Sequence, residues 1–335
     1  MTAFTLLQDL IEGTGNPVPC WRWARDLGAN TVRVFGMWSV TGFDPRREPA
    51  YYEALDGACA MLAEDGLRLH YVAFTDQVPD SSVLMHETEQ NFHMLKVIEV
   101  LRQHDNALLE VENETWKNGS TAGRFPREWF DGVLSTRSSW EDGNTPLEAG
   151  SVLDFTTEHT PRGDGWERKS KNLLETSRLG LGEPGQPNYF PPTNEPAIAG
   201  EPNRLEDSTP RQYADYMAVA ELFASGACLH GLGLERCQIP ADDSVARAVA
   251  AVWADPPPAD LAAIGMYVRG QKDGGGPCPI AHSDDLALRT FAMIAGNRAT
   301  AVVVSPRPGW SLQPVNGWRV TRTYGYDNNT IDLER

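Results

Sequence analysis

Short runs of β-branched and aromatic residues alternate with helical patterns along most of the chain. Strand-like runs cover 29–38, 67–74 and 107–114, and helical patterns cover about 50–65 and 86–104 between them. In the first of these helices, Leu55, Cys59 and Leu62 recur at the spacing of one helix face. Strands that alternate with helices are typical of βα units and a parallel sheet.

Further segments extend the series to eight strands. Ala3-Phe4 predicts a short first strand, and the runs 132–135, 152–155 and 226–231 predict three later ones. The segment 187–195 contains prolines, which central strands rarely tolerate, so we expect a short or irregular seventh strand there. Helical patterns at 166–179 and 209–225 separate the later strands. The whole order predicts an α/β fold, the (β/α)8 TIM barrel, which occupies about 250 residues.

The pattern changes after a helical segment at about 242–253 and the proline run that follows it. Strand-like runs then lie at 264–269, 299–305 and 317–322. We therefore expect the barrel to cover 1–257, and a small C-terminal β-rich appendage, packed on the barrel, to cover 258–335.

Charge narrows the range of partners. The 335 residues include 46 acidic and 29 basic ones, for a net charge of −17, and no run is rich in Lys and Arg. A nucleic-acid partner is not expected, because phosphate binding needs a basic patch. The negative field also disfavours acidic glycans and favours a neutral partner.

The same sequence lacks membrane and targeting signals. No stretch approaches about 18 continuous apolar residues, and the first residues lack the pattern of a secretory signal peptide. We expect a soluble protein without a membrane partner, either cytoplasmic or secreted by a route that the sequence does not reveal. The oligomeric state is left open.

Motifs for cofactors and metals are missing as well. The sequence has no P-loop, no G-x-G-x-x-G after a strand, no G-x-S-x-G elbow and no H-x-H or H-E-x-x-H pair. Its five cysteines form no C-x-x-C pair. We therefore expect no cofactor and no metal site.

Two Asn-Glu pairs end predicted strands, Asn113-Glu114 on the fourth and Asn194-Glu195 on the seventh. A barrel presents its functional groups at the C-terminal ends of its strands. Glycoside hydrolysis needs two carboxyl groups that flank the scissile bond, one protonated and one ionised. The two pairs therefore predict a glycosidase with Glu114 and Glu195 as catalytic residues.

The run Leu109–Glu114, which reads LEVENE, resembles the strand-4 signature of the clan A glycoside hydrolases, especially the family 5 cellulase-like enzymes. The resemblance spans about 28–235. It implies a retaining glycosidase that acts on β-glycosidic bonds of a poly- or oligosaccharide, with Glu114 as acid/base and Glu195 as nucleophile. It also implies that Asn113 binds the sugar 2-hydroxyl and that Arg33 lies close to the nucleophile.

These roles carry electrostatic expectations. Glu114 needs a raised pKa, from burial and from its ionised partner, while Arg33 keeps Glu195 ionised. Glu110 shares a strand face with Glu114, and we expect it to pair with a basic residue inside the barrel.

Other polar and aromatic side chains fall at the same strand ends and are candidates for sugar contacts, because aromatic rings stack on the apolar faces of sugars. For each, packing or a structural hydrogen bond is the alternative. The predicted substrate-binding residues are Arg33, Trp38, Asp76, Asn113, Trp116, His159, Tyr189, Asn194 and His230.

Three alternatives stay open. Asn194-Glu195-Pro196 has the proline that usually follows the acid/base in clan A, which would make Glu195 the acid/base, but too little sequence follows it to complete a barrel. Glu158 is the substitute nucleophile if the seventh strand lies elsewhere. Thr115, where the clan usually has proline, and the short first strand fit a non-catalytic glycan-binding or structural barrel.

Overall fold

The computed structural model describes residues 1–114, 125–140, 154–158, 197–199, 201–222, 226–257, 266–269, 281–282, 289–304 and 310–335. The chain divides into two compact units. The first contains 1–161, 198–206 and 228–241, and the second contains 162–197, 207–227 and 242–335. The domain boundary expected after residue 257 stays a prediction.

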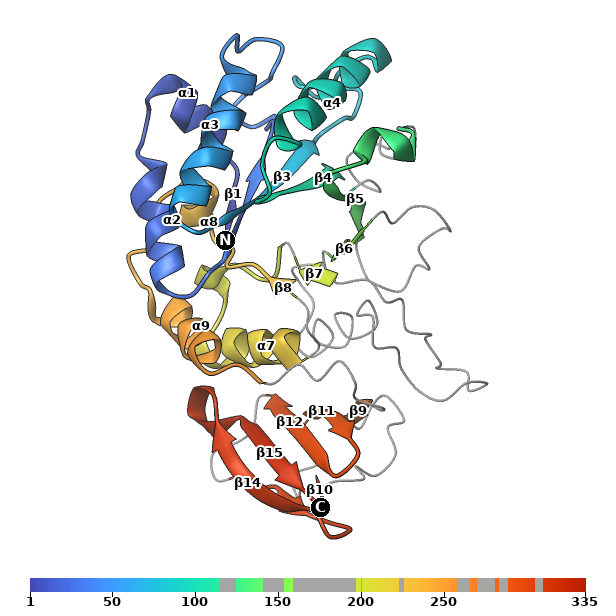
Figure 1. Ribbon diagram of the computed structural model, residues 1–335. Coiled ribbons are helices and arrows are strands. Elements are labelled where there is room, and N and C mark those ends of the chain that lie inside the picture. The colour runs from blue at the N-terminus through green and yellow to red at the C-terminus, as the bar shows by residue number, and fades with distance from the viewer. Residues whose placement is uncertain are drawn as a thin grey trace. The chain divides into compact units, whose positions relative to one another are not determined.

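Eight described strands form one sheet whose order follows the chain, from β1 to β8 (Figure 1). Neighbours from β1 to β6 pair in parallel, as the alternation of strands and helices predicted. The strands are β1 (Thr2–Ala3), β2 (Thr31–Phe35), β3 (Arg68–Phe74), β4 (Ala107–Glu112), β5 (Leu134–Trp140), β6 (Thr156–Glu158), β7 (Ala197–Ala199) and β8 (Gly226–Ala227).

A backbone hydrogen bond between residues of the first unit closes the sheet. The Thr2 amide donates a hydrogen bond to the Leu229 carbonyl at 2.9 Å, and the Arg33 amide donates to the Met1 carbonyl at 2.7 Å. The residues just after β8 therefore lie beside β1, which itself pairs with β2. The chain forms a (β/α)8 barrel with a separate β-rich appendage, as predicted, and the short first strand is confirmed.

Helices cover the first part of the barrel as the apolar spacing predicted. In α3 the buried residues include Leu55, Cys59 and Leu62, the three that marked its inner face. Proline occupies the first turn of α2, where its missing amide proton costs nothing. The helices of the first unit include α1 (Leu6–Glu12), α2 (Pro17–Asp26), α3 (Tyr51–Glu64), α4 (Glu87–Leu101), η2 (Arg127–Phe130) and α8 (Leu232–Glu235), and η3 (Leu205–Asp207) begins there.

Gly36, just after β2, lies where two tyrosines converge. The Tyr51 hydroxyl donates to the Gly36 carbonyl at 2.5 Å and lies 2.5 Å from the Tyr71 hydroxyl. A Cβ at Gly36 would lie 2.6 Å from Tyr71 Cζ. Only glycine fits this close approach without a shift of the tyrosines.

The second unit contains α7 (Pro210–Leu222), α9 (Ser244–Ala254) and a five-stranded antiparallel sheet in the order β14-β15-β12-β11-β9. The runs predicted at 264–269, 299–305 and 317–322 correspond to β9 (Met266–Arg269), β12 (Arg298–Val304) and β14 (Arg319–Tyr324). The remaining strands are β11 (Arg289–Ala295), β15 (Thr330–Glu334) and the pair β10 (Ala281–His282) and β13 (Gln313–Pro314), and η4 covers Tyr326–Asn328.

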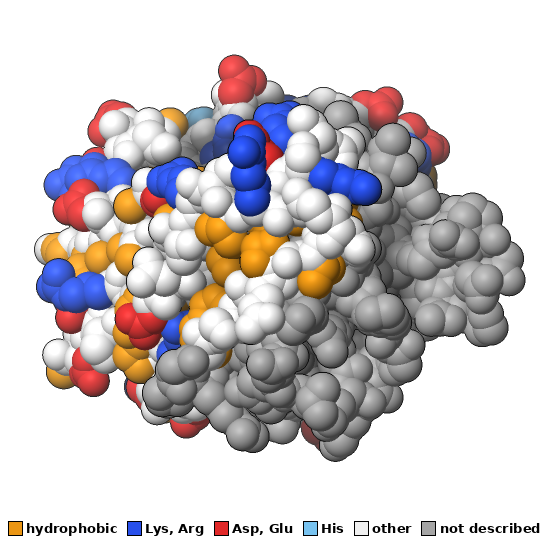
Figure 2. Space-filling model, turned by 90° about the horizontal axis from the view of Figure 1, so that it is seen from below, with side chains coloured by type: hydrophobic (Ala, Val, Ile, Leu, Met, Phe, Trp, Pro, Cys, Tyr) orange, Lys and Arg blue, Asp and Glu red, His pale blue; other side chains and the backbone are white. Residues whose placement is uncertain are grey.

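The surface carries mixed charge. On the face drawn in Figure 2, basic side chains lie among acidic ones, with apolar side chains between them. Within the described ranges, no helix is both long and apolar enough to cross a membrane.

Candidate active site

Arg33 lies inside the barrel on β2, and its side chain is fully buried. Its guanidinium binds Glu110 of β4 with two hydrogen bonds, from Nε to Oε2 and from Nη2 to Oε1, both 3.0 Å long. His70 of β3 adds its Nε2 atom 3.1 Å from Glu110 Oε2. Glu110 therefore pairs with basic residues inside the barrel, as predicted.

The same guanidinium joins two segments that are far apart in the chain. Nη2 donates to Asn113 Oδ1 at 2.8 Å, and Nη1 donates to Glu201 Oε1 at 3.0 Å. Asn113 follows β4 and Glu201 follows β7, so both come from the C-terminal ends of strands. The Glu201 side chain is only 7% exposed, so the ion pair between Arg33 and Glu201 is almost completely shielded from solvent.

The electrostatics hold this cluster in its charged form. Burial alone would lower the pKa of Arg33, but the negative charges of Glu110 and Glu201 outweigh it, and the pKa is raised. Each carboxylate gains in turn from the permanent positive charge of the guanidinium, which favours the ionised form. The arrangement thus provides one buried cation between two buried acidic side chains.

Glu114 leaves β4 in an unusual backbone conformation. The amide of Asn113 still donates to the Phe74 carbonyl at 3.0 Å, which extends the pairing of β3 with β4 by one residue. Glu114 then adopts a φ of +44° and is half-buried. Non-glycine residues rarely adopt positive φ, and such positions often occur at functional sites.

Two other predicted site residues lie at the ends of β2 and β3. Trp38 is half-buried and packs against the apolar cluster of Phe4, Phe35 and Val72. Its ring lies edge-on to that of Phe4, with 5.2 Å between the ring centroids. Asp76, with a φ of +51°, accepts hydrogen bonds from the Ser39 amide at 3.1 Å and hydroxyl at 2.5 Å. Asp76 thereby joins the segment after β3 to the segment after β2.

His230 lies below the surface rather than at an open rim. Its side chain is fully buried, with Nδ1 3.1 Å from the Pro202 carbonyl oxygen and Nε2 2.8 Å from Glu235 Oε1. Both ring nitrogens therefore face protein atoms. His230 contacts the candidate site at the carbonyl of Pro202, the residue after Glu201.

The remaining predicted site residues lie outside the described residues; they are Trp116, His159, Tyr189, Asn194 and Glu195. The side chain of Glu158, the alternative nucleophile, also lies outside them. The segment 187–195, predicted as the seventh strand, also lies outside the described residues. The strand described in the seventh position is β7, Ala197–Ala199, which follows Glu195 in the chain.

Sequence reasoning missed Glu201. The available signal was weak: a short apolar run at 197–199, followed by Gly200-Glu201-Pro202. Three residues are too few to show the alternation that identifies a strand. Its importance follows from its contact with Arg33, which is 168 positions away in the chain.

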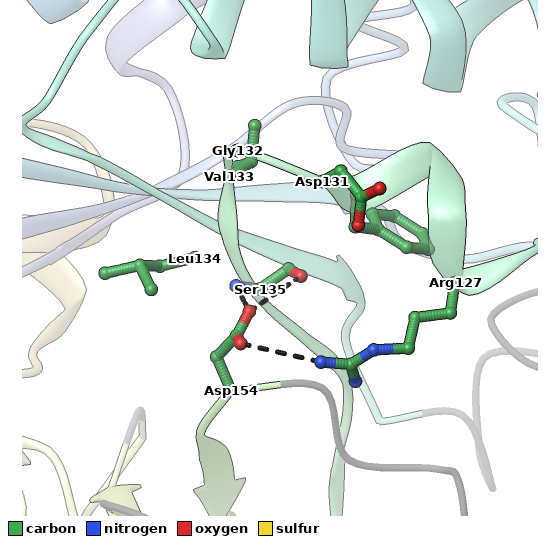
Figure 3. Close-up of a pocket in the computed structure, with 8 residues that line it drawn as sticks. Arg127, Asp131, Gly132, Val133, Leu134, Ser135 and Asp154 are labelled. Atoms are coloured by element: carbon green, nitrogen blue, oxygen red, sulfur yellow. Dashed lines mark hydrogen bonds and ion pairs between the residues drawn. The ribbon is translucent and has the colours of Figure 1, made fainter.

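A separate cavity of about 300 Å³ lies near the N-terminal ends of β5 and β6 (Figure 3). Asp154 accepts a hydrogen bond from the Ser135 amide at 2.9 Å and lies 3.9 Å from Arg127. Glu114 and Glu201 follow strands, whereas these residues precede or begin them, so the cavity belongs to the other end of the barrel. It is lined by Arg127, Phe130, Asp131, Gly132, Val133, Leu134, Ser135 and Asp154.

No protein-family model and no curated protein matches the chain. Solved structures do match. The β-glucanase SdGluc5_26A from Saccharophagus degradans in complex with cellotetraose is 11% identical, with a TM-score of 0.51 over 75% of this chain and 86% of its own. A variant of the GH5_18 protein from Streptomyces cattleya in complex with Manb1-4GlcNAc is 13% identical, with a TM-score of 0.50 over 77% of this chain and 81% of its own.

A GH5_18 protein from Bifidobacterium longum subsp. infantis is 14% identical, with a TM-score of 0.50 over 76% of this chain and 78% of its own. At these identities the likeness is one of fold. The GH5 proteins belong to family 5 of the glycoside hydrolases, the family that the run Leu109–Glu114 resembles. The chain has the (β/α)8-barrel fold that these family 5 glycoside hydrolases share.

Proposed function

We propose that this chain is a retaining glycosidase that cleaves β-glycosidic bonds of a poly- or oligosaccharide, with Glu114 as acid/base and Glu201 as nucleophile. One observation carries the proposal. The buried guanidinium of Arg33 binds both Asn113, the neighbour of Glu114, and Glu201. Asn113 and Glu201, from the ends of different strands, therefore meet at one guanidinium, and Glu114 follows Asn113 directly; this supports a pair of carboxyl groups that flank the scissile bond, as glycoside hydrolysis requires.

Glu201 takes the role that the sequence suggested for Glu195. In the family that the sequence resembles, an arginine on the second strand lies close to the nucleophile, and Arg33 binds Glu201. Glu201 follows the last residue of β7 by two positions, as Glu114 follows the last residue of β4. Glu195 precedes β7 in the chain, whereas barrel enzymes use residues that follow their strands.

The proposed reaction has two displacements. A carboxylate oxygen of Glu201, kept ionised by Arg33, attacks the anomeric carbon while the bond to the leaving oxygen breaks and Glu114 protonates that oxygen. Glu114 then removes a proton from water, which attacks the same carbon and releases Glu201. The sugar product keeps its original anomeric configuration, and no cofactor takes part in either step.

Asn113 is well placed to orient the sugar. Its Oδ1 atom accepts a hydrogen bond from Arg33, which holds the side chain at the end of β4, where the resemblance expects it to bind the sugar 2-hydroxyl. A neutral saccharide suits a chain with a net charge of −17. Two proteins of this fold were solved with saccharides, cellotetraose and Manb1-4GlcNAc, which supports the same substrate class.

The nucleophile can be identified by trapping. A panel of aryl β-glycosides would first find the sugar that the protein turns over. The matching 2-deoxy-2-fluoro glycoside, which slows the second step, would then label the nucleophile covalently for peptide mapping by mass spectrometry. We expect the label on Glu201, with Glu195→Gln labelled as fast as the wild type.

Azide distinguishes the two carboxylates by the product that it forms. Glu201→Gly leaves room for azide to attack directly, so we expect the inverted α-glycosyl azide. Glu114→Ala keeps the nucleophile, so azide attacks the covalent intermediate and the product is the β-glycosyl azide. Label on Glu195 would reassign the nucleophile, and no turnover or labelling with any sugar of the panel would favour a non-catalytic glycan-binding barrel.

A further inference from the structure

A network of polar side chains holds the segment that follows Glu201. His230 Nδ1 contacts the Pro202 carbonyl at 3.1 Å, and its Nε2 contacts Glu235 Oε1 at 2.8 Å. Arg204 binds the same Glu235 oxygen from Nη2 at 2.8 Å and from Nε at 3.0 Å. The His230 side chain is fully buried, and that of Glu235 is only 5% exposed.

This network is anchored to the barrel wall. The Glu235 carbonyl accepts from the Phe4 amide at 2.7 Å and from the Thr5 amide at 3.1 Å, just after β1. The His230 carbonyl accepts from the Leu205 amide at 2.8 Å, which adds a backbone link to the segment after β7. The segment that carries His230 and Glu235 is therefore bonded to the residues after β1, a strand that pairs with β2.

The chemistry of the partners defines which atoms donate. A carbonyl oxygen can only accept, so the Nδ1 atom of His230 carries the proton of the bond to Pro202. Burial acts to raise the pKa of Glu235, but its hydrogen bond to His230 and the charges of His230 and Arg204 lower it overall. Glu235 Oε1 lies 2.8 Å from Nε2, so both ring nitrogens have a protein partner.

Few rotatable bonds separate the Pro202 carbonyl from Glu201. The proline ring fixes φ at residue 202, and the same ring restricts the backbone of the residue before it to extended conformations. A hydrogen bond at the Pro202 carbonyl therefore limits the backbone of Glu201. Arg33 holds the carboxylate of the same residue from inside the barrel.

We propose that His230 is a positioning residue for Glu201, and that it acts through its Nδ1–H bond to the Pro202 carbonyl. Glu235, itself bound by Arg204, holds the ring in the orientation that this bond requires. The proposal rests on the proposed role of Glu201 as nucleophile. A displaced nucleophile reacts slowly, because a misplacement of about 1 Å can cost roughly 100-fold in rate.

Two conservative substitutions separate the two ring nitrogens. His230→Asn places an amide nitrogen where Nδ1 stood and keeps the donor to Pro202, whereas His230→Gln places one where Nε2 stood and keeps the contact with Glu235. The measured quantities are the rate constant and the saturation constant for labelling of Glu201 by the 2-deoxy-2-fluoro glycoside. Melting temperatures are recorded for both variants.

We expect His230→Asn to label within about threefold of the wild-type rate constant and His230→Gln to label at least about tenfold more slowly. The saturation constants should stay near the wild-type value, because sugar binding does not depend on the nucleophile's last few tenths of an ångström. His104→Ala is the matched control. His104 lies just before β4, at the other end of the barrel, and its Nε2 atom lies 2.8 Å from Asp56 Oδ1. Its labelling rate should match the wild type.

A purely structural role gives a different result. If the two variants lose labelling rate equally, in step with their melting temperatures, the positioning role of Nδ1 is wrong while the proposed function stands. If the wild type is not labelled at Glu201 at all, both proposals fail together. Should either His230 variant not fold, Glu235→Ala gives a second reading, because it removes the group that holds Nε2 of the ring. Slower labelling at a near-wild-type melting temperature supports the proposal, and unchanged labelling opposes it.

Discussion

Replacing Arg33 with lysine tests the buried charge cluster while keeping the positive charge. The guanidinium makes four hydrogen bonds, two to Glu110 and one each to Asn113 and Glu201, and its side chain is fully buried. Lysine offers three donors on a single nitrogen and cannot reproduce the planar fork. At least two of the four bonds should therefore be lost in Arg33→Lys.

The expected loss of stability is large. A hydrogen bond to a charged group contributes about 1.5–3 kcal/mol, so two of them amount to about 3–6 kcal/mol. Removing one partner of a buried ion pair costs about 3–5 kcal/mol, a range that applies to Arg33→Met, which leaves Glu110 without its cation. The same substitution at Arg22, which is 55% exposed and binds Asp65 at 2.8 Å, should cost less than about 1 kcal/mol.

Urea unfolding followed by tryptophan fluorescence measures both changes, and the chain has ten tryptophans. Arg33→Lys should move the unfolding midpoint down clearly, and Arg22→Lys should leave it nearly unchanged. The pair Arg33→Met and Arg33→Met/Glu110→Gln then tests the cause. The second change should recover part of the stability, because it removes a buried carboxylate that has lost its partner.

Two results would refute this reasoning. If Arg33→Lys and Arg22→Lys shift the midpoint equally, the interior bonds of Arg33 do not contribute as calculated. If Glu110→Gln destabilises the Arg33→Met protein further, the cost does not come from an uncompensated charge.

Two further predictions concern the wall of the barrel. Gly36→Ala should lower the free energy of unfolding in urea by about 1–3 kcal/mol, because the new Cβ would clash with Tyr71. Gly57 lies in α3 with open space around it, so Gly57→Ala should raise the free energy of unfolding by about 0.5–1 kcal/mol. Equal effects of the two substitutions would contradict the steric argument. Burial lowers the pKa of His93 to about 4. Because the unfolded histidine has a pKa of about 6.5, it binds protons first as the pH falls, and about 2 kcal/mol of stability should be lost between about pH 7 and pH 5. His93→Phe should lose less over this range, and an unchanged pH dependence of the urea midpoint would oppose this assignment.

The sequence alone predicted the order of strands and helices over the first half of the barrel. Leu55, Cys59 and Leu62 identified the buried face of α3, and the run that ends at Glu114 identified the C-terminal end of β4. Both signals are local, because they depend on the repeat of a helix or strand and on the residues within it. The pairing of Glu110 with a basic residue was also predictable, since a carboxylate inside a barrel needs a cation.

Only the tertiary structure pointed to Glu201 and to the role proposed for His230. The seventh strand has three residues, too few for a periodic pattern, and the Asn194-Glu195 pair before it drew attention to Glu195. The contact of Glu201 with Arg33 joins residues 168 positions apart, and that of His230 with Pro202 depends on the return of the chain to β1. Local sequence determines which segments become strands, whereas the closure of the barrel decides which side chains meet inside it.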